Sequence, residues 1–162
     1  MKIIADTGPL IGLAKIGKLY LLEKYVDEVL IPPIVYKELL GKIGPESEEI
    51  EKALNNFIKI SNQPQIAKEL HAILSNLDEG EKQAIALAKS YAEDILLLID
   101  ERAGREVANR LQIPITGLLG MLIKFKAKRE IQSISAIVEK LRQHGYWLSD
   151  EVIALAKKLA GE

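Results

Sequence analysis

The most informative hydrophobic pattern in this chain is a run of five apolar residues, Ile95 to Ile99, that is bounded by Asp94 and Asp100. A short apolar run without polar interruptions is typical of a strand covered on both faces, as in a parallel sheet. Lys2–Ala5 shows the same pattern, because its apolar residues also end at an acid, Asp6. Both runs therefore predict buried strands that stop at a carboxylate.

The rest of the chain alternates between short apolar runs and segments with helical spacing. We expect strands over 2–5, 29–31, 57–60 and 95–99, with a short strand or turn over 114–117. We expect helices over 9–16, 19–25, 33–40, 47–54, 67–74, 79–91, 101–111, 118–128, 133–144 and 150–159. This order predicts a single α/β domain over 1–162, a three-layer sandwich in which helices flank a central parallel sheet. Residues 130–162 would form a C-terminal helical extension.

Composition narrows the class of protein. The chain has 162 residues, 48% of them hydrophobic, so it is long enough for one domain with a proper core. Its formal net charge of −1 neither indicates nor excludes nucleic-acid binding, since a local patch is sufficient. The absence of cysteine excludes disulfides and thiolate metal sites. No apolar run approaches the ~20 residues of a membrane span, and the first run ends too early for a signal peptide. We expect a soluble, cytoplasmic protein without a membrane partner.

Four acids stand out by their positions. Asp6 and Asp100 follow predicted strands, and ligands of open α/β sheets bind beyond the carboxyl ends of strands. Glu38 lies on the helical face of Ile34 and Val35, while Glu81 shares the packing face of Ala84, Ile85 and Ala88. A carboxylate on an apolar face costs free energy unless it is paired or binds a cation. These positions predict four carboxylates at one crevice.

Each acid also has an ordinary structural explanation. Asp6 before Thr-Gly-Pro, and Asp100 before a helix, are both typical N-cap residues. Glu38 could be a salt-bridged residue at the edge of its apolar stripe. Asp78 and Glu81 have the spacing of a capping box, which by itself would account for both.

The combination of the four acids has a physical requirement that no single one has. Four neighbouring carboxylates repel and raise one another's pKa values, unless divalent cations lie between them. Oxygen-only ligands suit Mg²⁺ or Mn²⁺. Such ions generate hydroxide from bound water and stabilise charge during phosphodiester cleavage. The pattern therefore indicates phosphodiester chemistry.

Four motifs in this order resemble those of PIN-domain ribonucleases, over Lys2 to about Lys128. The resemblance is closest to a subgroup often found as toxins of toxin–antitoxin pairs (VapC-like). The motifs are Ile4-Ala-Asp6-Thr-Gly-Pro-Leu10, Val35-Tyr-Lys-Glu38-Leu, Leu77-Asp-x-Gly-Glu81-x-x-Ala-Ile-x-Leu-Ala88 and Leu98-Ile-Asp100-Glu-x-x-Gly-Arg105.

The resemblance implies a Mg²⁺- or Mn²⁺-dependent endoribonuclease with Asp6, Glu38, Glu81 and Asp100 as catalytic and metal-binding residues. It implies that Thr7 supports the first acid or a bound water. It also implies RNA as substrate, an antitoxin protein as partner, and a homodimer. The sequence departs from the family at Leu98, because the usual Thr-x-Asp before the last acid is absent.

Cations near these motifs could contact RNA phosphates. Arg102 and Arg105 follow the Asp100 strand, and Lys124 and Lys128 flank Phe125, which could stack on a base. The alternative for the lysines is a solvated helix end with Phe125 buried.

Two other functions stay open at this stage. One is phosphoryl transfer through an aspartyl phosphate at Asp6, although the second Asp of dehalogenase-like phosphatases is replaced by Gly8. The other is a non-catalytic PIN-like module that binds RNA or protein. The apolar stripes at 131–141 and 152–159 are a possible interface.

Overall fold

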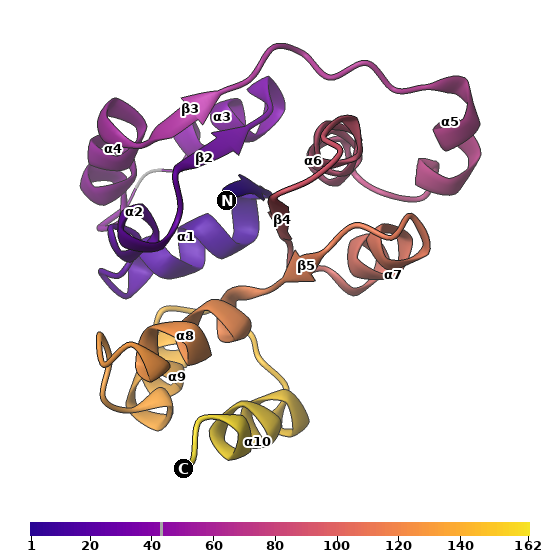
Figure 1. Cartoon of the computed structure of the whole chain (residues 1–162). Coiled ribbons are helices and arrows are strands. Elements are labelled where there is room, and N and C mark those ends of the chain that lie inside the picture. Colours follow the sequence, from indigo (N-terminus) through magenta and orange to yellow (C-terminus); the bar gives the residue numbers. More distant parts are fainter. Residues whose placement is uncertain (43) are drawn as a thin grey trace.

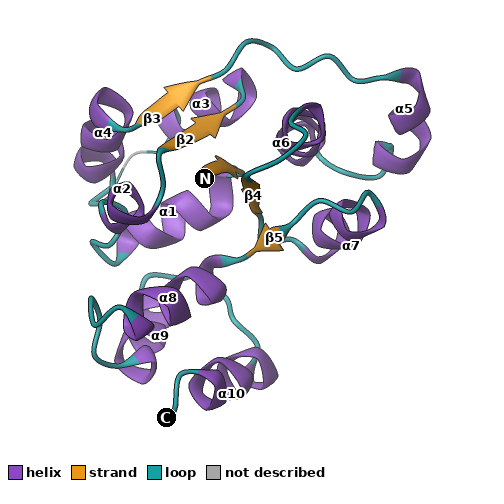
Figure 2. Ribbon diagram, in the orientation of Figure 1, coloured by secondary structure: helices purple, strands orange, loops and turns teal. Residues whose placement is uncertain are grey.

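The computed structural model describes residues 1–42 and 44–162. Its centre is a sheet of five parallel strands in the order β3-β2-β1-β4-β5 (Figures 1 and 2). The strands are β1 (Lys2–Ala5), β2 (Glu28–Ile31), β3 (Ile58–Ile60), β4 (Ile95–Leu98) and β5 (Ile115–Thr116). The predicted α/β class with a parallel sheet is confirmed.

Helices connect these strands and cover both faces of the sheet. They are α1 (Thr7–Lys15), α2 (Leu21–Tyr25), α3 (Pro33–Leu40), α4 (Ser47–Asn56), α5 (Lys68–Leu74), α6 (Glu79–Ser90), α7 (Arg102–Arg110), α8 (Leu118–Ala127), α9 (Ile134–Gln143) and α10 (Asp150–Leu159). In Figure 1, α1 and α8 to α10 lie on one side of the strands, and α6 and α7 lie on the other. Every predicted helix is present, and the ends differ from expectation by at most two residues.

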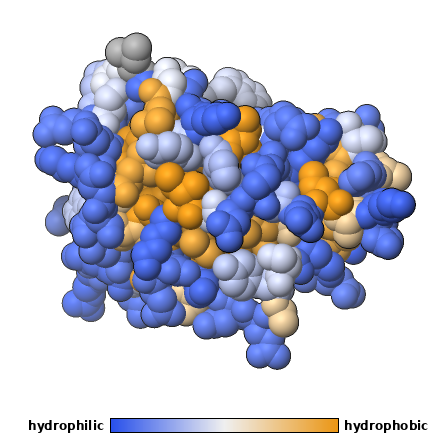
Figure 3. Space-filling view, turned by 90° about the horizontal axis from the view of Figure 1, so that it is seen from above, coloured by the Kyte–Doolittle hydropathy of each residue, from blue (hydrophilic) through white to orange (hydrophobic). Residues whose placement is uncertain are grey.

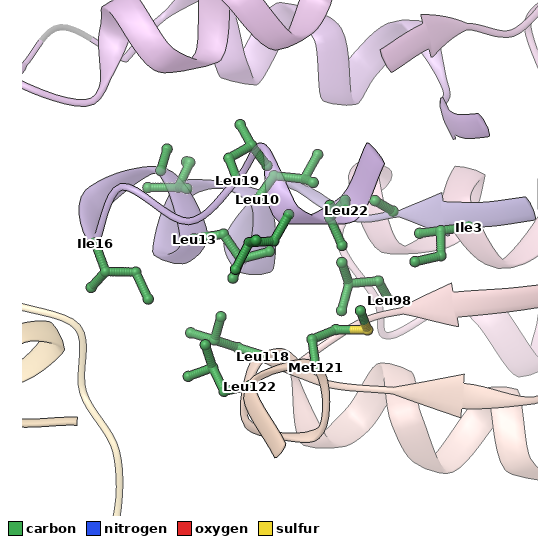
Figure 4. Packing of buried hydrophobic residues seen from close by; sticks show 14 of the residues in the cluster. Ile3, Leu10, Leu13, Ile16, Leu19, Leu22, Leu98, Leu118, Met121 and Leu122 are labelled. Atoms are coloured by element: carbon green, nitrogen blue, oxygen red, sulfur yellow. The ribbon is translucent and has the colours of Figure 1, made fainter. Parts of the chain in front are cut away.

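Alternating side chains of the strands divide the core in two. In β1, Ile3 packs with the cluster that contains α1 and α8, whereas Ile4 packs with the cluster that contains α6. Leu98 and Leu97 of β4 alternate in the same way. Figure 4 shows the first cluster, in which side chains of α1 and α8 meet around Leu98. Both faces of the sheet are therefore buried, which explains the uninterrupted apolar runs of β1 and β4.

The C-terminal helices are part of the first core cluster. Phe125, Ile134 and Leu141 are fully buried, and α10 contributes Ile153 and Ala156. The last residue, Glu162, accepts hydrogen bonds from the Ile134 backbone N–H (2.7 Å) and the Lys126 ammonium group (2.7 Å). These contacts join the end of the chain to both α8 and α9.

Several large apolar side chains are exposed at the surface, and two groups of them can be named by their elements. Leu40 of α3 and Ile60 of β3 belong to the upper part of the molecule in Figure 1, and Figure 3 shows apolar patches among hydrophilic side chains on the face seen from above. Val152, Leu155 and Leu159 form a second exposed group along α10. Among the residues that the structure describes, no helix is long and apolar enough to cross a bilayer.

Candidate active site

Two of the predicted acids follow neighbouring strands. Ala5 of β1 lies opposite Leu98 of β4, and the Asp6 backbone N–H donates to the Leu98 carbonyl at 3.0 Å. Asp100 comes two residues after Leu98. Because β1 and β4 are parallel, their carboxyl ends meet at one edge of the sheet, and Asp6 and Asp100 both lie at that edge.

Asp6 is the most buried of the acids, with 8% of its surface exposed. It occupies the N-cap position of α1, but its side chain makes no capping hydrogen bond. Its pKa is raised to about 7, mainly by burial and also by the nearby charges of Asp78, Glu81 and Glu38, against the opposing effect of the Thr7 backbone N–H. A side chain with this environment is not explained by helix capping.

The space beside Gly80, in the first turn of α6, is narrow, and carboxylates border it. A Cβ atom at this position would lie 2.9 Å from Glu38 Oε1, 3.1 Å from Asp6 Oδ1 and 3.4 Å from Asp78 Oδ1. Three carboxylates from three separate parts of the chain therefore face the same small volume. Any larger residue in place of Gly80 would occupy that volume.

Thr7 contacts Glu38 directly. Its Oγ1 donates a hydrogen bond to Glu38 Oε2 at 2.6 Å, and Thr7 itself is buried. Glu38 is exposed on α3, so this bond is what links its carboxylate to the start of α1. The bond leaves Oε1 facing the space beside Gly80.

Glu81 forms the capping box that was the alternative explanation for its position. Its backbone N–H donates to Asp78 Oδ1 (2.8 Å), and its Oε2 accepts from the Asp78 backbone N–H (3.2 Å). Only 5% of Glu81 is exposed, and burial, followed by the charge of Asp78, raises the pKa of its carboxyl. The residue thus caps α6 and also adds its carboxylate to the group around Asp6.

Asp100 is held by two donors from distant parts of the chain. Its Oδ1 accepts from the Leu118 backbone N–H at 2.8 Å, and its Oδ2 accepts from the Tyr146 hydroxyl. Asp100 therefore caps α8 rather than the helix directly after it. Burial and the charge of Asp100 raise the pKa of Tyr146 well above its usual range.

Sequence reasoning missed two residues of this region. Asp78 was interpreted only as a cap, although its Oδ1 also faces the space beside Gly80. No local pattern singles out Tyr146, because its contact with Asp100 spans 46 residues. The sequence gives one indirect signal. Leu98 stands two residues before Asp100, where the ribonucleases that the chain resembles usually have a threonine.

The predicted RNA-binding cations lie at different places. Arg105 is nearest to the acids, and its Nη1 donates to the Ile99 carbonyl at 2.9 Å. Arg102 is exposed and pairs with Glu106 at 3.2 Å. Lys124 and Lys128 are exposed on the later turns of α8, away from the end that contacts Asp100. Phe125 between them is fully buried, which agrees with the alternative of a solvated helix end and excludes base stacking by Phe125.

A comparison with models of known protein families assigns nearly the whole chain to one family. A family model described as a PIN domain matches residues 2–162, and this match includes α8, α9 and α10. The chain belongs to the PIN-domain family. PIN domains are typically nucleases that act on nucleic acid with divalent metal ions. None of the curated proteins compared with the chain matches it significantly.

The donor set of this PIN domain fits the chemistry of a divalent ion. The carboxylate oxygens of Asp6, Glu38 and Asp78 are hard ligands, and the missing side chain of Gly80 lets them approach the same point. In residues 1–42 and 44–162, however, no three His, Cys, Asp or Glu side chains already converge closely enough to hold one ion together. Binding would require the carboxylates to turn further toward one another, and Glu38, which Thr7 holds through Oε2, has Oε1 available for this.

Proposed function

We propose that this PIN domain is a metal-dependent endoribonuclease that cleaves RNA phosphodiester bonds. Asp6, Glu38, Glu81 and Asp100 would be the catalytic and metal-binding residues, with Mg²⁺ or Mn²⁺ as the cofactor. The observation that carries the proposal is the space beside Gly80, where Asp6 Oδ1 and Glu38 Oε1 would lie 3.1 and 2.9 Å from an added Cβ. Carboxylate oxygens that approach one another from separate parts of the chain are what a hard cation requires.

The electrostatics of Asp6 support a cation at this place. A buried carboxyl whose pKa rises to about 7 is costly to ionise, and neighbouring acids add to that cost. A divalent ion held by these acids would compensate this charge, and the chemistry it would supply is the activation of water for phosphodiester hydrolysis. The contribution of the chain is to hold the oxygens in place. Thr7 holds Glu38, the α6 cap holds Glu81, and the α8 backbone holds Asp100.

We propose single-stranded RNA as the substrate class, and the cations beside the acids support a contact with its phosphates. Arg105 lies beside the Asp100 strand, and its guanidinium borders Gly117 together with Asp100 Oδ1. A cation at that distance from the acids could hold a phosphate next to the scissile one. Arg102 could extend this contact, since it is exposed one turn earlier in α7. Lys124 and Lys128 would contribute only to a longer RNA path along α8.

Cleavage assays with matched variants test this proposal. Purified protein with Mn²⁺ should cut single-stranded RNA, and Asp6→Asn and Asp100→Asn should each reduce the rate by at least ~100-fold. Glu48→Gln is the control, because Glu48 is an exposed acid that pairs with Lys52 on α4. If Asp6→Asn cuts RNA as fast as the wild type, the proposed catalytic role of the acids is wrong.

A non-catalytic module is the second candidate, and one observation favours it. Both oxygens of Asp100 already accept hydrogen bonds from the protein, and so does one oxygen of Glu81. A chain that only binds RNA or protein would need no free carboxylate oxygens. This candidate predicts RNA binding without cleavage in Mg²⁺ or Mn²⁺, and no rise in Tm when either metal is added. Metal binding to the native state would raise Tm by mass action.

We further propose that the protein acts as the toxin of a toxin–antitoxin pair. Support comes from the four motifs around Asp6, Glu38, Glu81 and Asp100, which resemble that subgroup. Induced expression in bacteria should then arrest growth, while Asp6→Asn should not. Co-expression of a cognate antitoxin should restore growth. Unimpaired growth with the active wild-type protein would contradict a toxin role without affecting the ribonuclease proposal.

We also propose that the protein is cytoplasmic and that it forms a homodimer. Val152, Leu155 and Leu159 of α10 are 47, 57 and 64% exposed, and Trp147 just before the helix is 83% exposed. Apolar side chains grouped in this way are typical of an interface. Light scattering should show a dimer, and Leu155→Glu should convert it to a monomer. A wild-type monomer at high concentration would contradict this assembly.

A further inference from the structure

The contact between Asp100 and Tyr146 joins the acidic edge of the sheet to the C-terminal extension. Tyr146 lies in the loop between α9 and α10, and its hydroxyl donates to Asp100 Oδ2. The Tyr146 hydroxyl must be the donor, because an ionised carboxylate can only accept hydrogen bonds. With the Leu118 N–H on Oδ1 at 2.8 Å, each oxygen of Asp100 has its own donor. Two donors on opposite oxygens fix both the position and the rotation of the carboxylate.

The Tyr146 ring is itself held by the elements around it. A Cβ at Gly12 of α1 would lie 3.1 Å from Tyr146 Cε2, so the ring lies directly against the α1 backbone. The Tyr146 backbone N–H donates to the Leu141 carbonyl at 3.0 Å, which ties the residue to the end of α9. Gly12 thus provides the room in which the ring reaches the acidic edge.

The ends of the C-terminal extension are also anchored. Glu162 Oε2 accepts from the Ile134 N–H at the start of α9 and from Lys126 of α8, each at 2.7 Å. Arg142 pairs with Asp150 at the start of α10, across the loop that carries Tyr146. Contacts of the chain therefore lie on both sides of the loop from which the Tyr146 hydroxyl reaches Asp100.

We propose that Tyr146 is a positioning residue of the acidic site, through which the C-terminal extension holds the Asp100 carboxylate in one orientation. The inference rests on the proposed function. It assigns a role to residues 130–162, which lie outside the motifs that carry the four acids. Each carboxylate oxygen has two acceptor positions, so the bond from Tyr146 leaves Oδ2 able to bind a second partner.

Tyr146→Phe tests this role because it removes one oxygen atom and keeps the ring against Gly12. Tyr25→Phe is a matched control, since the Tyr25 hydroxyl also donates to a carboxylate, Glu130 Oε1 at 3.0 Å, far from the acids. Residues that orient metal ligands typically contribute 10- to 100-fold. We therefore expect Tyr146→Phe to lower kcat by about 10-fold and to weaken Mn²⁺ binding, followed by electron paramagnetic resonance, by a similar factor. The KM for RNA should stay the same, and Tyr25→Phe should match the wild type.

Two results would overturn the positioning role while leaving the ribonuclease proposal intact. One is a Tyr146→Phe protein with the kcat and the Mn²⁺ affinity of Tyr25→Phe. The other is a Tyr146→Phe protein that is faster than the wild type, which would make the tyrosine a block on Asp100.

A third measurement is independent of metal and of activity. Three-bond NMR couplings that report χ1 of Asp100 should indicate one rotamer in the wild type and in Tyr25→Phe, and averaging in Tyr146→Phe. An unchanged single rotamer in Tyr146→Phe would overturn the inference. If the wild type neither cleaves RNA nor binds Mn²⁺, the proposed function fails, and the couplings still decide whether Tyr146 positions Asp100.

Discussion

The Thr7 hydroxyl donates a hydrogen bond to Glu38 Oε2 at 2.6 Å, although the two residues are 31 positions apart. Thr7 opens α1 directly after Asp6, whereas Glu38 lies near the end of α3. One oxygen of Glu38 is thereby held by the chain, and the other faces the space beside Gly80. The Thr7 hydroxyl thus links the exposed Glu38 to the start of α1, directly after the buried Asp6.

Replacing Thr7 by Val should impair the site with little effect on stability. Val keeps the shape of Thr but cannot donate, so the Glu38 carboxylate would lose its fixed position. We expect metal affinity and RNA cleavage to fall by about 10-fold, as for other groups that orient ligands. Thr7→Ser keeps the hydroxyl and should retain most of the activity. Equal activities of the Val and Ser variants would show that the bond has no functional role.

Gly80→Ala should block the site while the protein folds normally. The added Cβ would approach Glu38 Oε1 to 2.9 Å and Asp6 Oδ1 to 3.1 Å, so these carboxylates would have to move away from Gly80. Gly8→Ala is the control, because a Cβ there meets no atom within 4 Å. Both changes favour a helix, by about 0.5–1 kcal/mol. Metal titration should show weaker binding for Gly80→Ala alone, and equal binding by both variants would contradict our assignment of the site.

The sheet could be predicted from the sequence because burial on both faces leaves an unmistakable pattern. The apolar runs ending at Asp6 and Asp100 give both the strands and their ends. Parallel pairing then brings the two acids to one edge. The helices were predictable for a similar reason, since their periodic apolar faces and caps are local features.

The contacts within the site were not predictable to the same extent. Tyr146 reaches Asp100 only because Gly12 makes room for its ring, and no local pattern near either residue records that packing. Asp78 and Glu81 have a local explanation, the capping box, that is correct but incomplete. The exposure of Trp147 likewise depends on how its loop lies against the molecule.

Glu162→Gln should loosen the C-terminal helices in a pH-dependent way. Hydrogen bonds from Lys126, Ile134 and Ser135 hold the pKa of the Glu162 carboxyl well below its usual range. A lowered pKa in the folded state means that the stabilisation is present above the unfolded value of about 4.3 and is lost as the pH falls. The wild type should therefore have a higher Tm than Glu162→Gln at pH 7, and the difference should shrink toward pH 3.

The exposed ion pair of Glu48 provides the comparison for that experiment. Glu48→Gln removes an i,i+4 pair with Lys52 at the surface, where such pairs contribute little. We expect its Tm to follow the wild type at both pH values. If Glu162→Gln also does so, the anchoring contact at the end of the chain does not stabilise α9 and α10.

The burial of Asp6 predicts that the metal-free protein is destabilised by its own site. Its pKa rises from an ordinary 3.8 to about 7 on folding, so between these values the folded state keeps a proton that the unfolded state has released. Stability must then fall as the pH rises through this window. Above pH 7 the cost reaches roughly 4 kcal/mol.

Asp6→Asn removes this ionisation and should be more stable than the wild type in EDTA at pH 8. The gap between the two free energies of unfolding should close toward pH 4. Urea unfolding at several pH values measures the gap, and Mn²⁺ should narrow it by stabilising only the wild type. A gap that does not change with pH would mean that Asp6 is ionised without cost, and the electrostatic support for a cation at this place would be lost.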